Sequence, residues 1–213
     1  MTTEPMTEDR RAGNVVTDGS PPHLTTTRLL LACGALAGPL FVATAGIQTL
    51  TRDGFDLGHQ PISLLSLGDL GWIQISNFVV AGLLSVAFAV GVRRVLRADR
   101  GRWRPRLLAL FGVGLVAGGI FVPDPALGFP PGTPDRSPDT MSWHGTLHAV
   151  APPLSFAALI LACALFARRF AAGQERGWAW YSSVTSAGAL VLAAWPDPDG
   201  VSVRLAVAIV LGF

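Results

Sequence analysis

Arg93-Arg94-Val95-Leu96-Arg97-Ala98-Asp99-Arg100-Gly101-Arg102-Trp103-Arg104-Pro105-Arg106 carries seven of the sixteen basic residues in this 213-residue chain. Apolar runs lie on both sides of it, at about residues 72–92 and 107–122. A short basic connector between apolar runs is typical of a cytoplasmic loop, because basic loops stay on the cytoplasmic side of a bilayer. The stretch therefore predicts a membrane protein whose orientation can be assigned.

The composition agrees with a membrane protein. Hydrophobic residues make up 50% of the chain and charged residues only 14%, with a mean hydropathy of +0.47, whereas soluble domains carry about 25% charged residues. The basic cluster is a short connector, so the lipid bilayer is the expected partner and nucleic acid is not. Cys33 and Cys163 both lie inside apolar runs, and two such residues build neither a disulfide framework nor a thiolate zinc site.

Six apolar runs predict an all-α fold, a polytopic transmembrane helix bundle, because about 20 apolar residues span a bilayer. The runs cover about residues 29–50, 72–92, 107–122, 143–167, 178–194 and 201–213. The sixth run is too short to span, so we expect either a fragment of a longer protein, which is favoured, or an incomplete last helix. The polar residues 1–27 are expected to form a disordered cytoplasmic tail, and residues 28–213 the helix bundle.

The connections between the runs alternate in charge. Arginines gather before the first run, between the second and third, and between the fourth and fifth. The remaining connections carry mostly aspartate: Asp53, Asp56, Asp69, Asp124, Asp135, Asp139, Asp197 and Asp199. Under the positive-inside rule this pattern predicts a multi-pass protein of the cell membrane with a cytoplasmic N-terminus. All six tryptophans lie near the ends of runs, as expected for residues at the two membrane interfaces.

The side expected to face outward holds the residues that could carry chemistry. His144 and His148 are four residues apart at the start of the fourth run, so their imidazoles share a helix face. With His59 and Asp124 from neighbouring segments they predict a metal site, and this ligand set suits Zn²⁺. Such an ion could activate a water molecule for hydrolysis. Two alternatives stay open: histidines that only hydrogen-bond loop carbonyls, and haem ligation.

The segment His59–Gly68 is half apolar and too short to span, which predicts a short helix in the outer interface. Ser63 and Ser66 would lie on its His59 side, either as a polar wall of an outer cavity or on a plain connector. The proline-rich residues 123–142 are expected to form a stiff loop over the same region.

Polar residues and glycines inside the runs predict helix contacts. Gln74 and Asn77 are expected to face the bundle interior, because polar groups avoid lipid. Gly34-x-x-x-Gly38 and Gly114-x-x-x-Gly118 allow close approach of neighbouring helices, although glycine is also common in this composition.

Several of these motifs, in this order, resemble the domain-of-unknown-function 998 family. They are His59–Gly68, Gly71-Trp72-Ile73-Gln74, Asn77-Phe78, Asp124-Pro125, Gly128-Phe129-Pro130-Pro131-Gly132, His144 and His148. The resemblance covers about residues 28–213 and implies a bacterial membrane protein with six transmembrane helices and no established activity. The chain departs from the family at its C-terminus, where the sixth helix stops early.

A more distant similarity is to the membrane hydrolases that include alkaline ceramidases and the progestin and adipoQ receptors. These proteins place a Ser, an Asp and several His around zinc, and Ser63, Asp124, His144 and His148 resemble that set. Seven helices are usual there, and the motif spacings differ. Three hypotheses follow. The first is a metal-dependent membrane hydrolase acting on lipid, with Ser63 and Asp124 as catalytic residues. The second is a non-catalytic small-molecule carrier or partner-binding membrane subunit, and the third is a haem protein.

Overall fold

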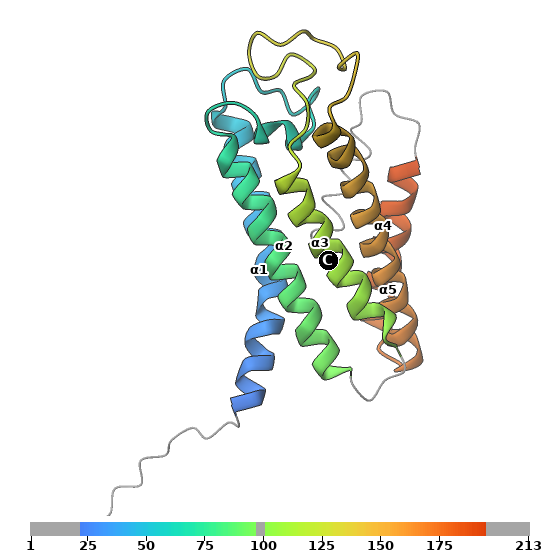
Figure 1. Cartoon of the computed structure of the whole chain (residues 1–213). Helices are drawn as coiled ribbons and strands as arrows, with labels where there is room; N and C mark the ends of the chain where they lie inside the picture. Colours follow the sequence, from blue (N-terminus) through green and yellow to red (C-terminus); the bar gives the residue numbers. More distant parts are fainter. Residues whose placement is uncertain (1–21, 97–100, 195–213) are drawn as a thin grey trace, which may run out of the picture.

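A computed structural model describes residues 22–96 and 101–194 of the chain. The elements are α1 (Pro22–Thr51), the 3-10 helix η1 (Ile62–Ser66), α2 (Gly71–Val95), α3 (Trp103–Ile120), α4 (Trp143–Ala172) and α5 (Arg176–Ala194). Figure 1 shows the five long helices side by side, with successive helices running in opposite directions. The prediction of an all-α fold is confirmed.

Three helices are long and apolar enough to cross a membrane: Leu24–Thr51, Gly71–Val95 and Trp143–Ala172. These spans support a multi-pass membrane protein. The helices α3 and α5 occupy two further predicted runs and are shorter, at 18 and 19 residues. The predicted sixth run and residues 1–21 of the predicted tail lie outside the described residues, and α1 begins at Pro22, inside the segment expected to be tail.

Each long helix packs on the next one along the chain. The contact between α2 and α3 is close because Gly82 and Gly112 face each other: a Cβ on either would lie 2.6 Å from the backbone oxygen of the other. Between α3 and α4, a Cβ on Gly114 would overlap the hydroxyl of Ser155. Small residues thus let neighbouring backbones approach, as expected where lipid supplies no hydrophobic driving force between helices.

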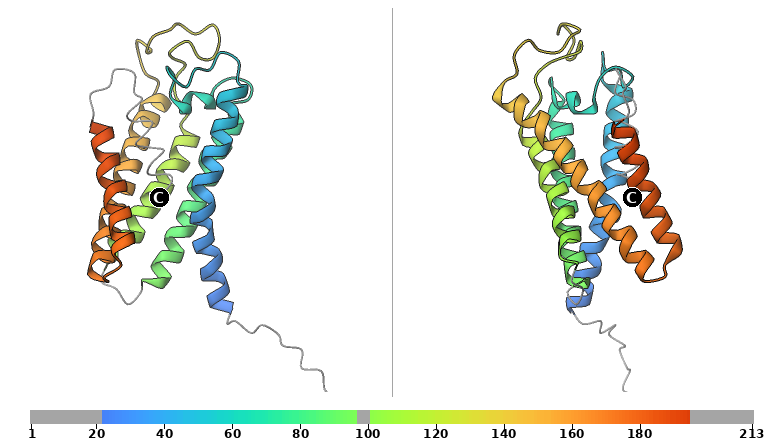
Figure 2. Two further views of the ribbon diagram at one scale, coloured as in Figure 1. Left: turned by 180° about the vertical axis from the view of Figure 1, so that it is seen from behind. Right: turned by 90° about the vertical axis from the view of Figure 1, so that its right-hand side faces the viewer.

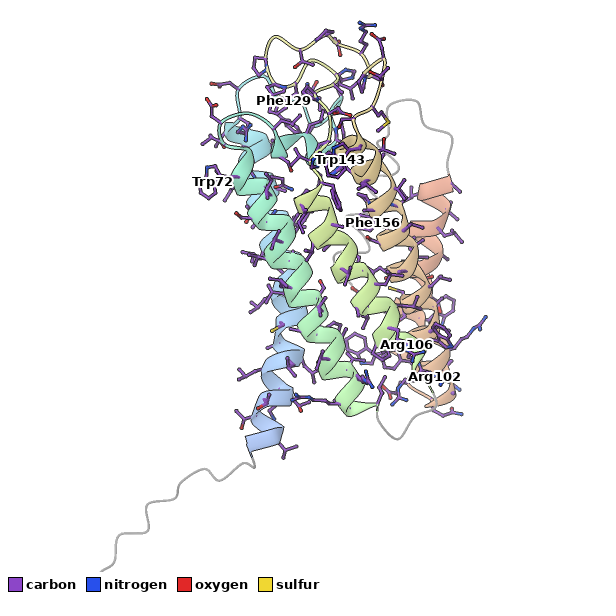
Figure 3. The ribbon with its side chains drawn as sticks, viewed as in Figure 1. Trp72, Arg102, Arg106, Phe129, Trp143 and Phe156 are labelled. Carbon is purple, nitrogen blue, oxygen red and sulfur yellow. The ribbon has the colours of Figure 1, made fainter. Side chains whose placement is uncertain are left out.

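The two ends of the bundle differ in structure and charge. At one end the connections 52–70 and 121–142 fold against each other, and we call these two segments the cap (Figures 1 and 2). The opposite end, which we call the arginine end, holds the start of α1 and the α2–α3 and α4–α5 connections. Figure 3 shows Phe129 and Trp143 at the capped end and Arg102 and Arg106 at the arginine end.

Among the described residues, the charge separates almost completely between the two ends. The capped end has two arginines and six aspartates: Arg52, Arg136, Asp53, Asp56, Asp69, Asp124, Asp135 and Asp139. The arginine end has nine arginines and one glutamate: Arg28, Arg93, Arg94, Arg102, Arg104, Arg106, Arg168, Arg169, Arg176 and Glu175. The topology therefore places the basic connections of the sequence at one end of the bundle and the acidic connections at the other.

Candidate functional site

Arg52, which directly follows α1, holds the cap together. Its Nη2 donates to the carbonyl of Leu67 at 2.6 Å and its Nη1 to the carbonyl of Leu65 at 3.3 Å. The guanidinium also lies over the ring of Phe129, 5.4 Å from its centre. Burial lowers the pKa of Arg52, and the charge of Asp69 opposes this shift. Since an arginine starts from such a high pKa, the group stays charged and binds both η1 and the α3–α4 connection.

The α3–α4 connection reaches back to the α1–α2 connection through Gln60 and Phe129. The Gln60 side chain accepts a hydrogen bond from the Asp56 N–H at 3.0 Å and donates one to the Leu127 carbonyl at 2.7 Å. Phe129 is almost fully buried and meets the Phe55 ring edge-on. These contacts make the cap an ordered unit, which the proline-rich composition of residues 123–142 alone did not reveal.

His59 and His144 lie at the exposed surface of the capped end. His59 Nε2 is 2.7 Å from Asp135 Oδ1, and both side chains are at least half exposed. This pair links the two connections of the cap. The ring of His144 lies against the ring of Trp143, with ring centres 3.6 Å apart and the ring planes tilted by 35°. The expected short helix over residues 59–68 is present only as η1, so His59 lies in a turn before it.

Asp124 lies at the N-terminus of α4. Its Oδ2 accepts a hydrogen bond from the Ser142 N–H at 2.8 Å, and it packs so closely on Gly145 that a Cβ there would overlap the carboxylate. The Ser142 hydroxyl accepts a bond from the Gly145 N–H at 3.0 Å and so caps the helix. A negative charge at this position is favoured by the helix dipole. Asp124 therefore anchors α4 to the cap.

His148 is buried one turn further along α4. Its Nδ1 lies 2.6 Å from the carbonyl oxygen of Phe121 and 3.2 Å from that of Gly118. Both partners only accept, so Nδ1 carries the proton and donates to them. These carbonyls belong to the end of α3, where backbone oxygens have no partner within the helix. The contact fits the structural alternative that the sequence left open for this histidine.

No group of three or more His, Cys, Asp or Glu among the described residues is arranged to hold a metal ion. Each predicted ligand instead contacts the protein partner described above. Ser63 is half-buried in η1. The zinc site of His59, Asp124, His144 and His148, and the catalytic pair Ser63 and Asp124, therefore stay predictions that the described geometry does not support.

Three buried amide side chains form a cluster below η1, and we call Gln48, Gln74 and Asn77 the amide cluster. Gln48 Nε2 donates to Gln74 Oε1 at 2.8 Å, and Asn77 Nδ2 donates to Gln74 Oε1 at 3.3 Å and to the carbonyl of Phe41 at 3.1 Å. All three side chains are no more than 5% exposed. The inward orientation of Gln74 and Asn77 is confirmed. Gln48 was missed, although it is the lone glutamine of an apolar run.

All five long helices line an apolar cavity of about 390 Å³. Its walls consist of apolar side chains with few exceptions. The lining residues are Leu31, Gly34, Ala35, Ala37, Gly38, Phe41, Ala81, Ser85, Phe88, Leu108, Phe111, Leu115, Leu159, Phe166, Phe170, Trp178 and Tyr181. The cavity lies away from the histidines, and sequence periodicity did not point to it because every run is apolar on all sides.

Comparison with known proteins identifies one family. The sequence model of a family described as "Protein of unknown function (DUF998)" matches residues 35–196. No curated protein and no solved structure matches the chain.

Proposed function

The chain belongs to the DUF998 family, and we propose that it is a non-catalytic membrane protein that binds a lipid in the apolar cavity lined by all five long helices. The cavity carries this proposal. Its volume of about 390 Å³ falls within the range of small-molecule sites, about 300–1,000 Å³. Its walls are apolar, and bilayer lipid is the apolar molecule that surrounds a membrane-spanning bundle.

We commit to one occupant, the acyl chain of an anionic lipid. On α1 the lining runs from Leu31 to Phe41, a length of about 15 Å at 1.5 Å per residue. On α4 it includes Phe166 and Phe170 towards the arginine end. Arg104 donates a hydrogen bond to the carbonyl of Leu165 beside this lining, at 3.2 Å. Basic residues at the cytoplasmic face of a helix bundle favour anionic head groups, which would lie here while the chain enters the cavity.

Lipid binding can be measured with a photoactivatable anionic phospholipid and the purified protein in nanodiscs. Ala37 is buried and lines the cavity, so Ala37→Phe should fill it. Ala32 is exposed on the same helix and does not line it, so Ala32→Phe is the matched control. We expect labelling to fall about tenfold in the first variant only, equivalent to about 1.4 kcal/mol. Equal labelling of both variants would refute the proposal.

A second occupant must be distinguished from lipid. The apolar residues 201–213 lie outside the described part of the chain and are the other candidate occupant of the cavity. A disulfide formed between Ala37→Cys and a cysteine introduced in residues 201–213 would assign the cavity to this segment. That result would contradict lipid binding at this place.

The proposal includes an orientation and a helix count. We place the arginine end and the N-terminus in the cytoplasm and the cap outside, in a six-helix bundle that counts the run from residue 201. The separation of nine arginines from six aspartates supports this under the positive-inside rule. Both Arg102 and Asp139 are exposed. An impermeant thiol reagent on intact cells should label Asp139→Cys and spare Arg102→Cys, relative to the parent chain with its own two cysteines. The reverse pattern would invert the orientation.

A metal-dependent lipid hydrolase at the capped end is the second candidate. The arrangement of the bundle favours it only in that His59, Asp124, His144 and His148 all lie at this end. Metal analysis of protein purified without chelators tests it. Stoichiometric zinc that is lost in both His144→Ala and His148→Ala would support this candidate over the non-catalytic one.

A further inference from the structure

The amide cluster contains polar atoms that the protein leaves without a hydrogen bond. Gln48 Oε1, Gln74 Nε2 and Asn77 Oδ1 are buried and unpaired, as is Ser66 Oγ in η1. All four side chains are no more than 5% exposed. An unpaired polar atom is costly in a protein interior, and more so in a bundle surrounded by lipid. A partner for these atoms is therefore expected inside the bundle.

The hydrogen bonds that do form fix the orientation of the three amides. Gln74 Oε1 receives a donor from both Gln48 and Asn77. Rotating the Gln74 amide would point its NH₂ at these two donors. Gln48 Nε2 also reaches the carbonyl of Thr44 at 3.3 Å, and Asn77 Nδ2 that of Phe41, so these nitrogens are placed as donors too. The unpaired groups of the three amides are consequently the NH₂ of Gln74, which has two N–H donors, and the side-chain carbonyl oxygens of Gln48 and Asn77.

We propose that the amide cluster is a hydration site within the membrane-embedded part of the bundle. One water molecule can accept from Gln74 Nε2 and donate to Gln48 Oε1 and Asn77 Oδ1, which matches the three or so bonds of a typical buried water. A cation would be repelled by the Gln74 N–H, and neither α1 nor α2 contains an Asp or Glu to neutralise it. The ligand class is therefore a small neutral molecule that both donates and accepts.

The amides are buried among neighbouring elements. Above them, η1 contacts both α1 and α2, and the Ser66 backbone packs so closely on Gly71 that a Cβ there would overlap it. Below them, Phe41 gives its carbonyl to Asn77 and its ring to the lining of the lipid cavity. The hydration site depends on the amides alone and does not rest on the proposed lipid binding.

Water-edited solid-state NMR on the full chain in lipid bilayers tests the site without any variant. Magnetisation from water should reach the Gln74 side-chain amide at short mixing times, several-fold faster than it reaches the backbone amide of Ala162. Ala162 is fully buried in α4 and does not line the apolar cavity, so it serves as the dry reference. Equal build-up at Gln74 and Ala162 would overturn the proposal.

Two variants and a titration test the hydration site further. Asn77→Leu removes one acceptor and should slow the transfer to Gln74 several-fold. Ser183→Ala on α5 is the control, because the exposed Ser183 hydroxyl donates to the carbonyl of Ala179 in its own helix at 2.7 Å and does not line the cavity, and the transfer should not change. Shifts of the Gln48 and Gln74 side-chain signals on titration with sodium or potassium would instead identify a cation and overturn the assignment to water.

Discussion

Alanine at Gly112 should destabilise the bundle, relative to alanine at Gly46, by an amount that the α2–α3 contact determines. The new Cβ would lie 2.6 Å from the backbone oxygen of Gly82 and 2.9 Å from the backbone nitrogen of Val86. Neither atom can rotate away, so the two helices must separate until these distances pass at least 3.0 Å. Overpacking of this kind typically costs about 1–3 kcal/mol. Gly46 has no atom within 4 Å of its Cβ position.

The comparison with Gly46 isolates the contact. Both substitutions gain the same intrinsic helix propensity of alanine over glycine, about 1 kcal/mol, which cancels in the difference. The free energy of unfolding can be measured in mixed detergent micelles, where Gly112→Ala should be about 1–3 kcal/mol less stable than Gly46→Ala. Gly82→Ala should behave like Gly112→Ala, and the double variant should cost less than the sum, because one helix separation relieves both clashes. Equal stability of Gly112→Ala and Gly46→Ala would show that α2 and α3 are not in backbone contact.

Four further predictions concern the cap. Arg52→Gln removes charged hydrogen bonds to two carbonyls and should lower the stability of the cap by about 2–3 kcal/mol, seen as faster amide hydrogen exchange in residues 60–67; unchanged exchange would exclude the anchoring role. Gly145→Ala should displace the Asp124 carboxylate and lower the free energy of unfolding, measured by thermal denaturation, by about 1–3 kcal/mol. An unchanged free energy of unfolding would contradict the close packing of Asp124 on Gly145. His59→Ala should cost less than about 1 kcal/mol, since its pair with Asp135 is exposed; a larger loss would point to a buried role. Chelation of divalent metals should leave the melting temperature unchanged, and a fall reversed by zinc would revive the metal site.

The helices could be predicted because a helix surrounded by lipid has to be apolar along its whole length, and such a run is visible in the sequence. The predicted runs at 72–92 and 178–194 correspond to α2 (Gly71–Val95) and α5 (Arg176–Ala194) within a few residues. Run length is set by membrane thickness and run ends by Arg, Trp and Pro, all of which are visible in the sequence. The family resemblance was confirmed over residues 35–196.

The site was less predictable because its contacts join segments far apart in the chain. The histidine spacing at 144 and 148 gives a shared helix face, yet it does not say that α3 ends beside that face and offers its carbonyls to His148. Likewise, the pairing of His59 with Asp135 depends on how two loops fold together. The cavity could not be predicted from the sequence, because the apolar residues that line it have the same composition as a surface facing lipid.

The cap also imposes an order on biosynthesis. Arg52 and Gln60 emerge from the ribosome long before their partners Phe129 and Leu127. The Gln60 amide and the Arg52 guanidinium therefore lack part of their partners until α3 has formed and the loop after it has reached the capped end. A chain in which α3 does not pack on α2 cannot complete the cap. The cap is thus complete only after the first three helices and the loop that follows them are in place.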